Sequence, residues 1–483
     1  MNDQIRVRFA PSPTGYLHVG GLRTALYNYL FARRHNGRFV LRIEDTDQAR
    51  KVEGAVENLI ETLRWAGIEY DEGPGREGDV GPYVQSQRLP IYHSHVQQLI
   101  DAGTAYSCFC TPERLDEIRQ KQMAAKQAVA YDRHCRDLSP ADAARRIAAG
   151  EKRVVRMKVP LTGEMTFHDI IRGDVTIGYN VLDDQVILKS DGFPTYHLAV
   201  VVDDHLMGVT HVIRGEEWLP SVPKHILLYQ YFGWSVPQMA HLPLLLNPDR
   251  SKLSKRQGDV AVEDYRTKGY LKEAMVNFIA FLGWNPCDER EIFSMQELTE
   301  AFTLERVGQS GAVFNVDKLN WLNQQHLKLK PAAEIAAMLR PMLAARGITD
   351  VTDEYLQRAI GLMRERVTLL PEFIENGLYL FRDPDEYEDA GVKKSWDAEA
   401  VGRITTLADE LASLAMFDHP SIEGCVRLLS ERWGIKAGKI IHPTRLAVSG
   451  RTGGPGLFEM MELLGRDAVV RRLRSAVERI PVR

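Results

Sequence analysis

The first segment of the chain that could carry out chemistry covers residues 5–21 and reads IRVRFAPSPTGYLHVGG. Alternating apolar residues predict a short strand over residues 5–10, and an apolar helical pattern begins at about His18. The prolines and glycine between them predict a turn. Free backbone N–H groups and the positive end of a helix dipole would then surround one anion. We therefore expect a phosphate site, formed by Pro11, Ser12, Pro13, Thr14, Gly15, His18, Gly20 and Gly21.

A second group of cations lies far along the chain, in the segment KLSKR of residues 252–256. Lys252, Lys255 and Arg256 stand close together beside Gly258. Taken alone, such a run is typical of a charged surface loop. Together with the N-terminal segment, it favours a site that binds and neutralises the phosphates of a nucleotide.

These two segments resemble the signatures of a known family. The first is similar to the "HIGH" motif of class I aminoacyl-tRNA synthetases and the second to their "KMSKS" loop. The flanking words APSPTG (residues 10–15) and RIEDTD (residues 42–47) resemble the bacterial glutamyl-tRNA synthetases, and the resemblance covers essentially the whole chain. Gly21 and Arg256 depart from the class-wide motifs in a way that is usual for the glutamyl branch. Glutaminyl-tRNA synthetases carry Glu-Pro-Asn-Gly where this chain has SPTG.

The resemblance implies glutamate–tRNA ligase activity, with ATP and Mg²⁺ as cofactors and L-glutamate and tRNA(Glu) as partners. Because activation displaces pyrophosphate from ATP, positioned cations would lower its barrier. We expect His18, Lys252 and Lys255 to be catalytic, with Lys255 also binding ATP. Two alternatives stay open, namely a non-discriminating enzyme that also charges tRNA(Gln) and an enzyme similar to glutaminyl-tRNA synthetase.

A glutamate pocket needs cations for two carboxylates and an anion for the ammonium group, and arginine can offer each carboxylate a bidentate fork. By resemblance, the family's glutamate-contacting positions are Arg8, Ser12, Glu44, Tyr196 and Arg214. Some members of the family carry Asn where this chain has Val200. For any one of these residues alone, a structural ion pair would be the commoner role, whereas the set of five favours a pocket.

Three cysteines indicate a metal site. Cys108 and Cys110 are one residue apart and Cys135 follows downstream, and thiolates favour tetrahedral zinc. Some bacterial glutamyl enzymes are known to bind zinc with such cysteines and a tyrosine, and by this resemblance Tyr131 is the fourth ligand. His134 and Asp137 are rival fourth ligands. We expect a structural Zn²⁺ rather than a catalytic one, since phosphate displacement does not require zinc.

The elements that must position these residues alternate between strand and helix in the first half of the chain. We expect strands at residues 5–10 and 38–43, helices from about 18 and around 53–66 and 87–102, and hence a parallel sheet. The apolar run of residues 196–202 predicts a buried parallel strand. Beyond residue 323 helices dominate, at 332–345, 353–370 and 398–414.

The expected fold class is α/β. The resemblance implies the Rossmann-like nucleotide-binding domain of a class I synthetase, split by an α+β insertion and followed by an all-α C-terminal anticodon-binding half. We expect the catalytic domain to comprise residues 1–105 and 191–250. Residues 106–190 would be the acceptor-stem-binding insertion with the zinc site, 251–325 the KMSKS loop and stem-contact region, and 326–483 the anticodon-binding region.

Composition excludes several classes of protein. The 483 residues carry a net charge of −4, which argues against a generally basic nucleic-acid coat. From Arg432 onward, however, the sequence contains 11 lysines and arginines and only 4 acidic residues. We therefore expect anticodon contacts in this basic stretch and at Arg364 or Arg366. Five cysteines do not indicate a disulfide framework, and neither a secretory signal nor a membrane span is visible. We expect a cytoplasmic monomer.

The sequence argues against two other functions. One is a tRNA-free adenylyl transferase or a shortened tRNA-modifying relative, which would lack the C-terminal helical half. The other is a nucleic-acid-binding module without catalysis, which would not need His18, Lys255 or the five pocket positions. We also expect Asp203, Asp204 and the segment of residues 214–218 to be cleft-edge and helix-capping residues rather than a metal cluster.

Overall fold

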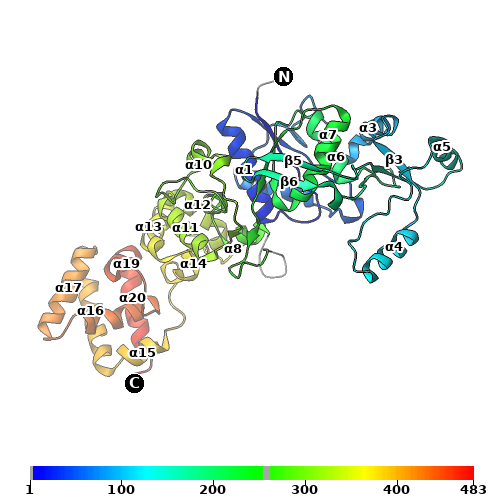
Figure 1. Cartoon of the computed structure of the whole chain (residues 1–483). Helices are drawn as coiled ribbons and strands as arrows, with labels where there is room; N and C mark the ends of the chain where they lie inside the picture. Colours follow the sequence, from blue (N-terminus) through cyan, green and yellow to red (C-terminus); the bar gives the residue numbers. More distant parts are fainter. Residues whose placement is uncertain (1–3, 254–260, 483) are drawn as a thin grey trace. The chain divides into compact units, whose positions relative to one another are not determined.

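The structure is a computed structural model that describes residues 4–253 and 261–482. They divide into two compact units (Figure 1). Unit 1 comprises Met1–Tyr265 and Met275–Val316, and unit 2 comprises Arg266–Ala274 and Asp317–Arg483. The boundary between the units passes through two helices, α8 (Val262–Lys268) and α9 (Lys272–Ala280).

Unit 1 mixes strands and helices. Its strands are β1 (Arg6–Phe9), β2 (Arg38–Leu41), β3 (Ala105–Cys108), β4 (Val154–Met157), β5 (Glu164–Asp169), β6 (Gly173–Gly178), β7 (Val186–Leu188), β8 (His211–Gly215), β9 (Gln238–Leu242), β10 (Leu245–Leu246) and β11 (Ala312–Val313). Its helices are α1 (Val19–Arg34), α2 (Ala55–Trp65), α3 (Leu89–Asp101), α4 (Pro112–Ala124), α5 (Pro140–Ala148), α6 (Tyr196–Leu206), α7 (Val222–Phe232) and α10 (Met295–Ala301).

The first strand, turn and helix form as the sequence predicts. In β1, Val7 and Phe9 are buried, and the strand pairs in parallel with β2 so that Arg8 lies opposite Val40. The pairing continues past the strands, because the amide of Glu44 donates to the carbonyl of Pro11 over 3.0 Å. The turn after β1 is therefore attached to the segment after β2, which brings Glu44 beside the phosphate-binding residues predicted for the turn.

A second group of strands has the order β6-β5-β9-β8, with β8, β9 and β5 parallel to one another. The register of β8 and β9 places Arg214 opposite His241, and Asp169 ends the neighbouring strand β5. Since β1 also contacts β8, the carboxyl ends of these strands meet at one edge. Ligands of open α/β sheets bind outside that edge.

The prediction of a buried strand at residues 196–202 is wrong, because the segment forms helix α6. A continuous apolar run has no period, so it cannot distinguish a buried strand from a buried helix. Residues 198–204 are all buried, and α6 packs with α3 and α7 around one apolar core. The three helices lie near one another in Figure 1. Thr195, the residue before α6, has an extended backbone. The strand that follows α6 in the chain is β8.

The segment that carries the three cysteines is built on a small antiparallel sheet of order β3-β4-β7. Cys108 is the last residue of β3 and is buried. Helices α4 and α5 follow, each beginning with a side-chain cap, from Thr111 and Ser139 respectively. The short strands expected between residues 106 and 190 are thus present.

Unit 2 is helical throughout its described residues. Its remaining helices are α11 (Val316–Leu329), α12 (Ala332–Ala344), α13 (Asp353–Met363), α14 (Glu372–Glu375), α15 (Asp389–Ser395), α16 (Ala398–Ser413), α17 (His419–Arg432), α18 (Gly438–Ser449), α19 (Leu457–Leu464) and α20 (Arg466–Arg479). Their apolar faces share one core. The expected helix at 353–370 is shorter, since it ends at Met363 and a 3₁₀ turn follows. No helix within residues 4–253 or 261–482 is long and apolar enough to cross a membrane.

Candidate active site

A pocket of about 700 Å³ opens at the carboxyl edge of β1 and β8 in unit 1. It is lined by all the turn and helix residues predicted to bind phosphate, and by all five predicted glutamate-contacting residues. The first set is Pro11, Ser12, Pro13, Thr14, Gly15, His18, Gly20 and Gly21. The second set is Arg8, Ser12, Glu44, Tyr196 and Arg214.

The phosphate side of the pocket is built around the start of α1. His18 is the N-cap residue of the helix, and its Nδ1 accepts a hydrogen bond of 2.9 Å from the amide of Gly20. This bond fixes the imidazole at the point where the helix dipole is positive. At Gly21 a side chain would be crowded, because an added Cβ would lie 2.8 Å from Cδ1 of Leu17. Helix geometry and packing therefore both favour small residues here.

The second cationic segment is described only in part. Lys252 is exposed, bridges Leu246 through its backbone, and is not among the residues that line the pocket. Lys255 and Arg256 lie outside the described residues.

Arg8 is held by a buried ion pair in the pocket wall. Its Nε and one terminal nitrogen donate to the two carboxylate oxygens of Asp204, over 3.0 and 3.2 Å. Arg42 also donates to Asp204, over 2.8 Å, and to Glu44, over 2.9 Å. Arg42 thereby holds the carboxylates of both Asp204 and Glu44, which are 3% and 6% exposed.

Arg214 is also buried, at 5% exposure, but its surroundings differ from those of Arg8. Its Nε donates to Nε2 of His241 over 3.1 Å, and one terminal nitrogen donates to the hydroxyl of Tyr196 over 2.9 Å. The other terminal nitrogen lies 3.3 Å from Nδ1 of His225. In the part of the chain that the structure describes, no carboxylate forms an ion pair with Arg214. Three of its five N–H groups are used, which leaves one on each terminal nitrogen.

The histidines around Arg214 are neutral. Burial, with the charge of Arg214 as the next cause, lowers the pKa of His225 far below its usual value. Burial, followed by the charges of Lys224 and Arg214, lowers the pKa of His197 to about 3. Burial also lowers the pKa of His241, although its hydrogen bond to Asp169 opposes the shift. The Arg214 side chain is therefore a buried cation among neutral partners at the wall of a pocket.

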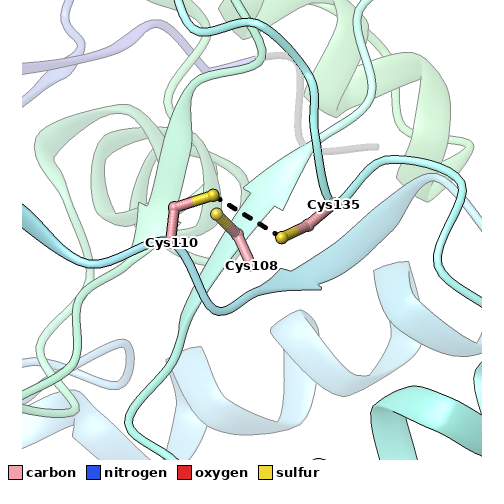
Figure 2. Close-up of side chains that lie close together, drawn as sticks. All are labelled: Cys108, Cys110 and Cys135. Carbon is pink, nitrogen blue, oxygen red and sulfur yellow. Dashed lines mark hydrogen bonds between the residues drawn. The ribbon is translucent and has the colours of Figure 1, made fainter. Parts of the chain in front are cut away.

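The side chains of the three cysteines meet in one group that could hold a metal ion (Figure 2). The sulfur atoms of Cys108, Cys110 and Cys135 all lie within 4.8 Å of one another, with Cys110 and Cys135 3.6 Å apart. The hydroxyl of Tyr131 lies 3.3 Å from the sulfur of Cys108 and 3.4 Å from that of Cys110. Zn–S bonds of about 2.3 Å in a tetrahedron separate sulfurs by about 3.8 Å, so the donor set fits zinc.

The rival ligands are not brought into this group. His134 and Asp137 are both exposed, and neither belongs to the cluster within the described residues. Two arginines lie close instead. Arg114 donates to the sulfur of Cys110 over 3.3 Å, and the guanidinium of Arg156 lies 3.9 Å from the ring centre of Tyr131. These cations would offset the excess negative charge of three thiolates around one Zn²⁺ ion.

Sequence reasoning missed the residues that hold the pocket arginines. Asp203 and Asp204 were expected to be cleft-edge and capping residues, but they lie inside α6 and pair with arginines from the segments around residues 8, 42 and 88. His241 and Asp169 were not singled out at all. A local signal exists for Asp169, which continues the alternation of buried Met165 and Phe167 along β5 and therefore falls on the buried face of the strand.

Comparison with known proteins places the chain in a family. Residues 4–321 match the family model described as the catalytic domain of class I tRNA synthetases (E and Q), and residues 334–477 match an anticodon binding domain. A glutamate–tRNA ligase of Chloroherpeton thalassium is 52% identical, over 99% of both chains. One of Chlorobium luteolum is 51% identical, over all of this chain and 99% of the relative.

A solved structure is also similar. The crystal structure of a glutamate tRNA ligase from Elizabethkingia meningosepticum, in complex with its amino acid, is 39% identical with a TM-score of 0.94. The match covers 99% of this chain and 100% of the chain in that structure. The expected α/β fold with a helical C-terminal anticodon-binding domain is confirmed. Because of its fold, its two matched domains and its sequence identity to these relatives, the chain belongs to the class I aminoacyl-tRNA synthetases of the E and Q type.

Proposed function

We propose that this chain is a glutamate–tRNA ligase. It activates L-glutamate with ATP to form glutamyl-adenylate and diphosphate, and then transfers the glutamyl group to the 3′ end of tRNA(Glu). The proposal is supported by relatives of that name that are about half identical over nearly the full length of both chains. The alternative function is a non-discriminating form that also charges tRNA(Gln). A preference for glutamine is an outcome of the experiments below.

The observation that carries the choice of amino acid is the unpaired charge of Arg214. A buried guanidinium without an anion is costly, and a ligand carboxylate would compensate it. Each terminal nitrogen keeps one N–H group, which is enough for a bidentate hydrogen bond to a carboxylate. Glutamine would bring a neutral amide to the same place and leave the cation uncompensated.

The rest of the amino-acid pocket fits the other groups of glutamate. Glu44 supplies negative charge for the ammonium group, and Arg42 keeps it in place. Arg8 keeps N–H groups that Asp204 does not use, and Ser12 and Tyr196 offer hydroxyl groups at the same wall. The five residues come from β1, its turn, the segment after β2, α6 and β8, so one folded unit assembles the whole pocket. This arrangement supports a monomer as the active form.

The chemistry of activation needs groups that stabilise charge on the leaving diphosphate. The start of α1 and the turn of residues 11–15 supply N–H donors, and His18 holds the first turn of the helix through Gly20. Bound Mg²⁺ would neutralise the phosphates of ATP. We assign Lys252 and Lys255 to the diphosphate, on the strength of their resemblance to the KMSKS loop.

We also propose a structural zinc ion held by Cys108, Cys110, Cys135 and Tyr131. Burial, and next the neighbouring thiols, raise the pKa of the Cys110 thiol to about 11, so a thiolate at this place needs a cation beside it. Zinc would join the end of β3 to the segment around residue 135 and so stiffen the insertion. It would supply no step of the reaction.

The tRNA would be bound by three parts of the chain. We assign residues 106–190 to the acceptor stem, 251–325 to the stem beside the KMSKS loop, and 326–483 to the anticodon. The basic stretch from Arg432, with Arg364 and Arg366, is the part of the last region that we assign to anticodon phosphates and bases. The nucleotide-binding domain would comprise residues 1–105 and 191–250.

The test of the proposed function is charging of unfractionated tRNA by the full-length protein with labelled glutamate. We expect ATP-dependent incorporation of label as an ester that mild alkali releases from the tRNA. Label that is stable to alkali would indicate modification of a base, and adenylate formed with no transfer to tRNA would indicate an adenylyl transferase. Either result would overturn the proposal.

A further inference from the structure

Three residues on adjacent strands form a line that ends at Arg214. Asp169 is the last residue of β5, His241 lies near the end of β9, and Arg214 lies near the end of β8. In the parallel register of β8 and β9, Arg214 is the direct partner of His241. Asp169 and His241 are completely buried, and neither belongs to the residues that line the pocket.

The hydrogen bonds along this line fix the position of one proton. Nε of an arginine can only donate, so Nε2 of His241 must accept the 3.1 Å hydrogen bond from Arg214. The single proton of the neutral imidazole is then on Nδ1, which donates to Oδ2 of Asp169 over 2.6 Å. Asp169 therefore sets the tautomer in which His241 can accept from Arg214.

The carboxylate of Asp169 is itself held by the backbone. Its Oδ1 accepts from the amides of Ile171 and Arg172, each over 3.0 Å, and lies 3.3 Å from the amide of His241. Burial would raise the pKa of Asp169, but its hydrogen bond with the His241 ring and those with the amides of Arg172 and His241 lower it instead. Asp169 is therefore an ionised carboxylate with one oxygen committed to the backbone and the other to His241.

We propose that Asp169 and His241 are positioning residues that orient Arg214 and keep its charge available for the substrate carboxylate. An imidazole between the two charged groups holds the guanidinium by its Nε, yet keeps the carboxylate of Asp169 off it. Arg8, another arginine of the pocket wall, differs from Arg214 because a carboxylate, that of Asp204, pairs with it directly. The inference rests on the proposed function, since it takes the ligand of Arg214 to be a carboxylate of glutamate.

The variant Asp169→Asn tests the proton's position without changing the size of the side chain. The backbone amides would keep the oxygen of the new amide in the place of Oδ1, so its NH₂ group would face Nδ1 of His241. The imidazole would then carry its proton on Nε2, opposite the N–H of Arg214, and two donors would meet. The change of tautomer should displace the guanidinium.

The expected result for Asp169→Asn is a rise of at least about tenfold in the KM for glutamate, with the KM for ATP changed by less than about twofold. The readout is steady-state tRNA charging, and thermal unfolding shows that the variant is folded. A purely structural role predicts the opposite pattern, in which the unfolding temperature falls while the two KM values of the folded protein stay as in the wild type. That pattern would overturn the proposal.

Two further variants keep the test decisive if Asp169→Asn does not fold. His241→Gln offers the same order of groups, with NH₂ toward Asp169 and oxygen toward Arg214, and should keep the KM for glutamate within about threefold of wild type. His241→Leu removes both groups and should raise it by at least about tenfold. Equal values for the Gln and Leu variants would contradict the proposal.

The matched control is Glu72→Gln, which makes the same kind of change in a carboxylate that pairs with Arg6 at the opposite end of β1. It should leave the KM for glutamate unchanged. The outcome is separable from that of the proposed function, which is tested by whether the wild type charges tRNA with glutamate at all. If the wild type uses another acidic amino acid, the ratio of the KM values for that amino acid between variant and wild type still tests whether Asp169 and His241 position Arg214.

Discussion

Arg8 and Arg214 are buried guanidinium groups in the wall of one pocket, but the protein treats their charges differently. Asp204 neutralises Arg8 directly, whereas the partners of Arg214 are a hydroxyl group and two neutral imidazoles. A carboxylate that arrives from solution is therefore drawn most strongly to Arg214. This contrast between two arginines is the residue-scale basis of the preference for glutamate.

Replacing Arg214 by Ala should remove most of the activity with glutamate. Truncating one partner of a buried, hydrogen-bonded charge pair costs about 2–5 kcal/mol, so kcat/KM for glutamate should fall about 30-fold or more. The measurement is charging kinetics at varied glutamate. Arg33→Ala, which removes a partly exposed arginine of α1 that pairs with Asp71, is the matched control and should change kcat/KM little. Unchanged efficiency in the Arg214 variant would remove this residue from the pocket.

The buried histidines predict that unit 1 loses stability in acid. The unfolded chain binds a proton at a histidine as the pH falls through about 6.5, whereas folded His197 does so only near pH 3. Between these values protonation of His197 in the unfolded chain lowers the free energy of unfolding by about 1.4 kcal/mol per pH unit. His197→Asn should therefore reduce the slope of stability against pH by about one proton between pH 4 and 6. An unchanged slope would show that His197 is protonated in the folded protein.

At the residue scale, the sequence predicted the residues that line the pocket better than the residues that hold them in place. Arg8, Glu44 and Arg214 could be named because the sequence around them resembles that of the bacterial glutamyl-tRNA synthetases. Their partners could not, since Asp204 is 196 positions from Arg8 in the chain, and only the folded sheet brings His241 next to Arg214. Long-range contacts of this kind leave no local pattern.

Two kinds of element decide where the site residues lie. Short parallel strands deliver side chains to one edge, and helix α1 delivers its N-terminus to the same place. The strand–turn–helix segment at residues 5–34 could be predicted because its apolar period changes from two to 3.6 and prolines mark the turn. Helix α6 could not, because its central residues are apolar on every side and no period remains to be read.

The cysteine group gives a prediction at the scale of one element. Purified full-length protein, prepared without chelator, should contain about one zinc per chain, and Cys108→Ser should lose it. Loss of the ion should loosen the β3-β4-β7 sheet and raise the KM for tRNA more than the KM for ATP. Metal analysis and charging kinetics measure these effects.

The matched control is Cys425→Ser, which changes a buried cysteine of α17 in the other unit. It should keep the zinc content of the wild type. Wild-type protein without zinc would return Cys108, Cys110 and Cys135 to the role of ordinary buried side chains.

The whole molecule joins an α/β unit with the pocket to a helical unit that matches an anticodon-binding domain. A division of this kind suits an enzyme whose specificity must come from both the amino acid and the tRNA. If binding of the correct tRNA is what makes bound ATP productive, the enzyme discriminates by induced fit. The sequence indicates such coupling only through its resemblance to the bacterial glutamyl-tRNA synthetases, because coupling is a property of the complex.

Glutamate-dependent exchange of pyrophosphate into ATP should therefore depend on tRNA. We expect the rate without tRNA to be at least about tenfold lower than the rate with tRNA, because the resemblance to the bacterial glutamyl-tRNA synthetases implies that ATP is bound unproductively until the acceptor end of the tRNA docks. Exchange assays with and without unfractionated tRNA measure the ratio. Vigorous exchange without tRNA would show that activation does not wait for the second substrate.

The most direct measurement of the central claim compares glutamate and glutamine as substrates of the wild-type protein, at equal ATP and tRNA. A pocket built around the unpaired charge of Arg214 predicts that kcat/KM for glutamate exceeds that for glutamine by at least about a hundredfold, since a neutral amide would leave a buried cation uncompensated. Equal efficiency with the two amino acids, or a preference for glutamine, would contradict the account.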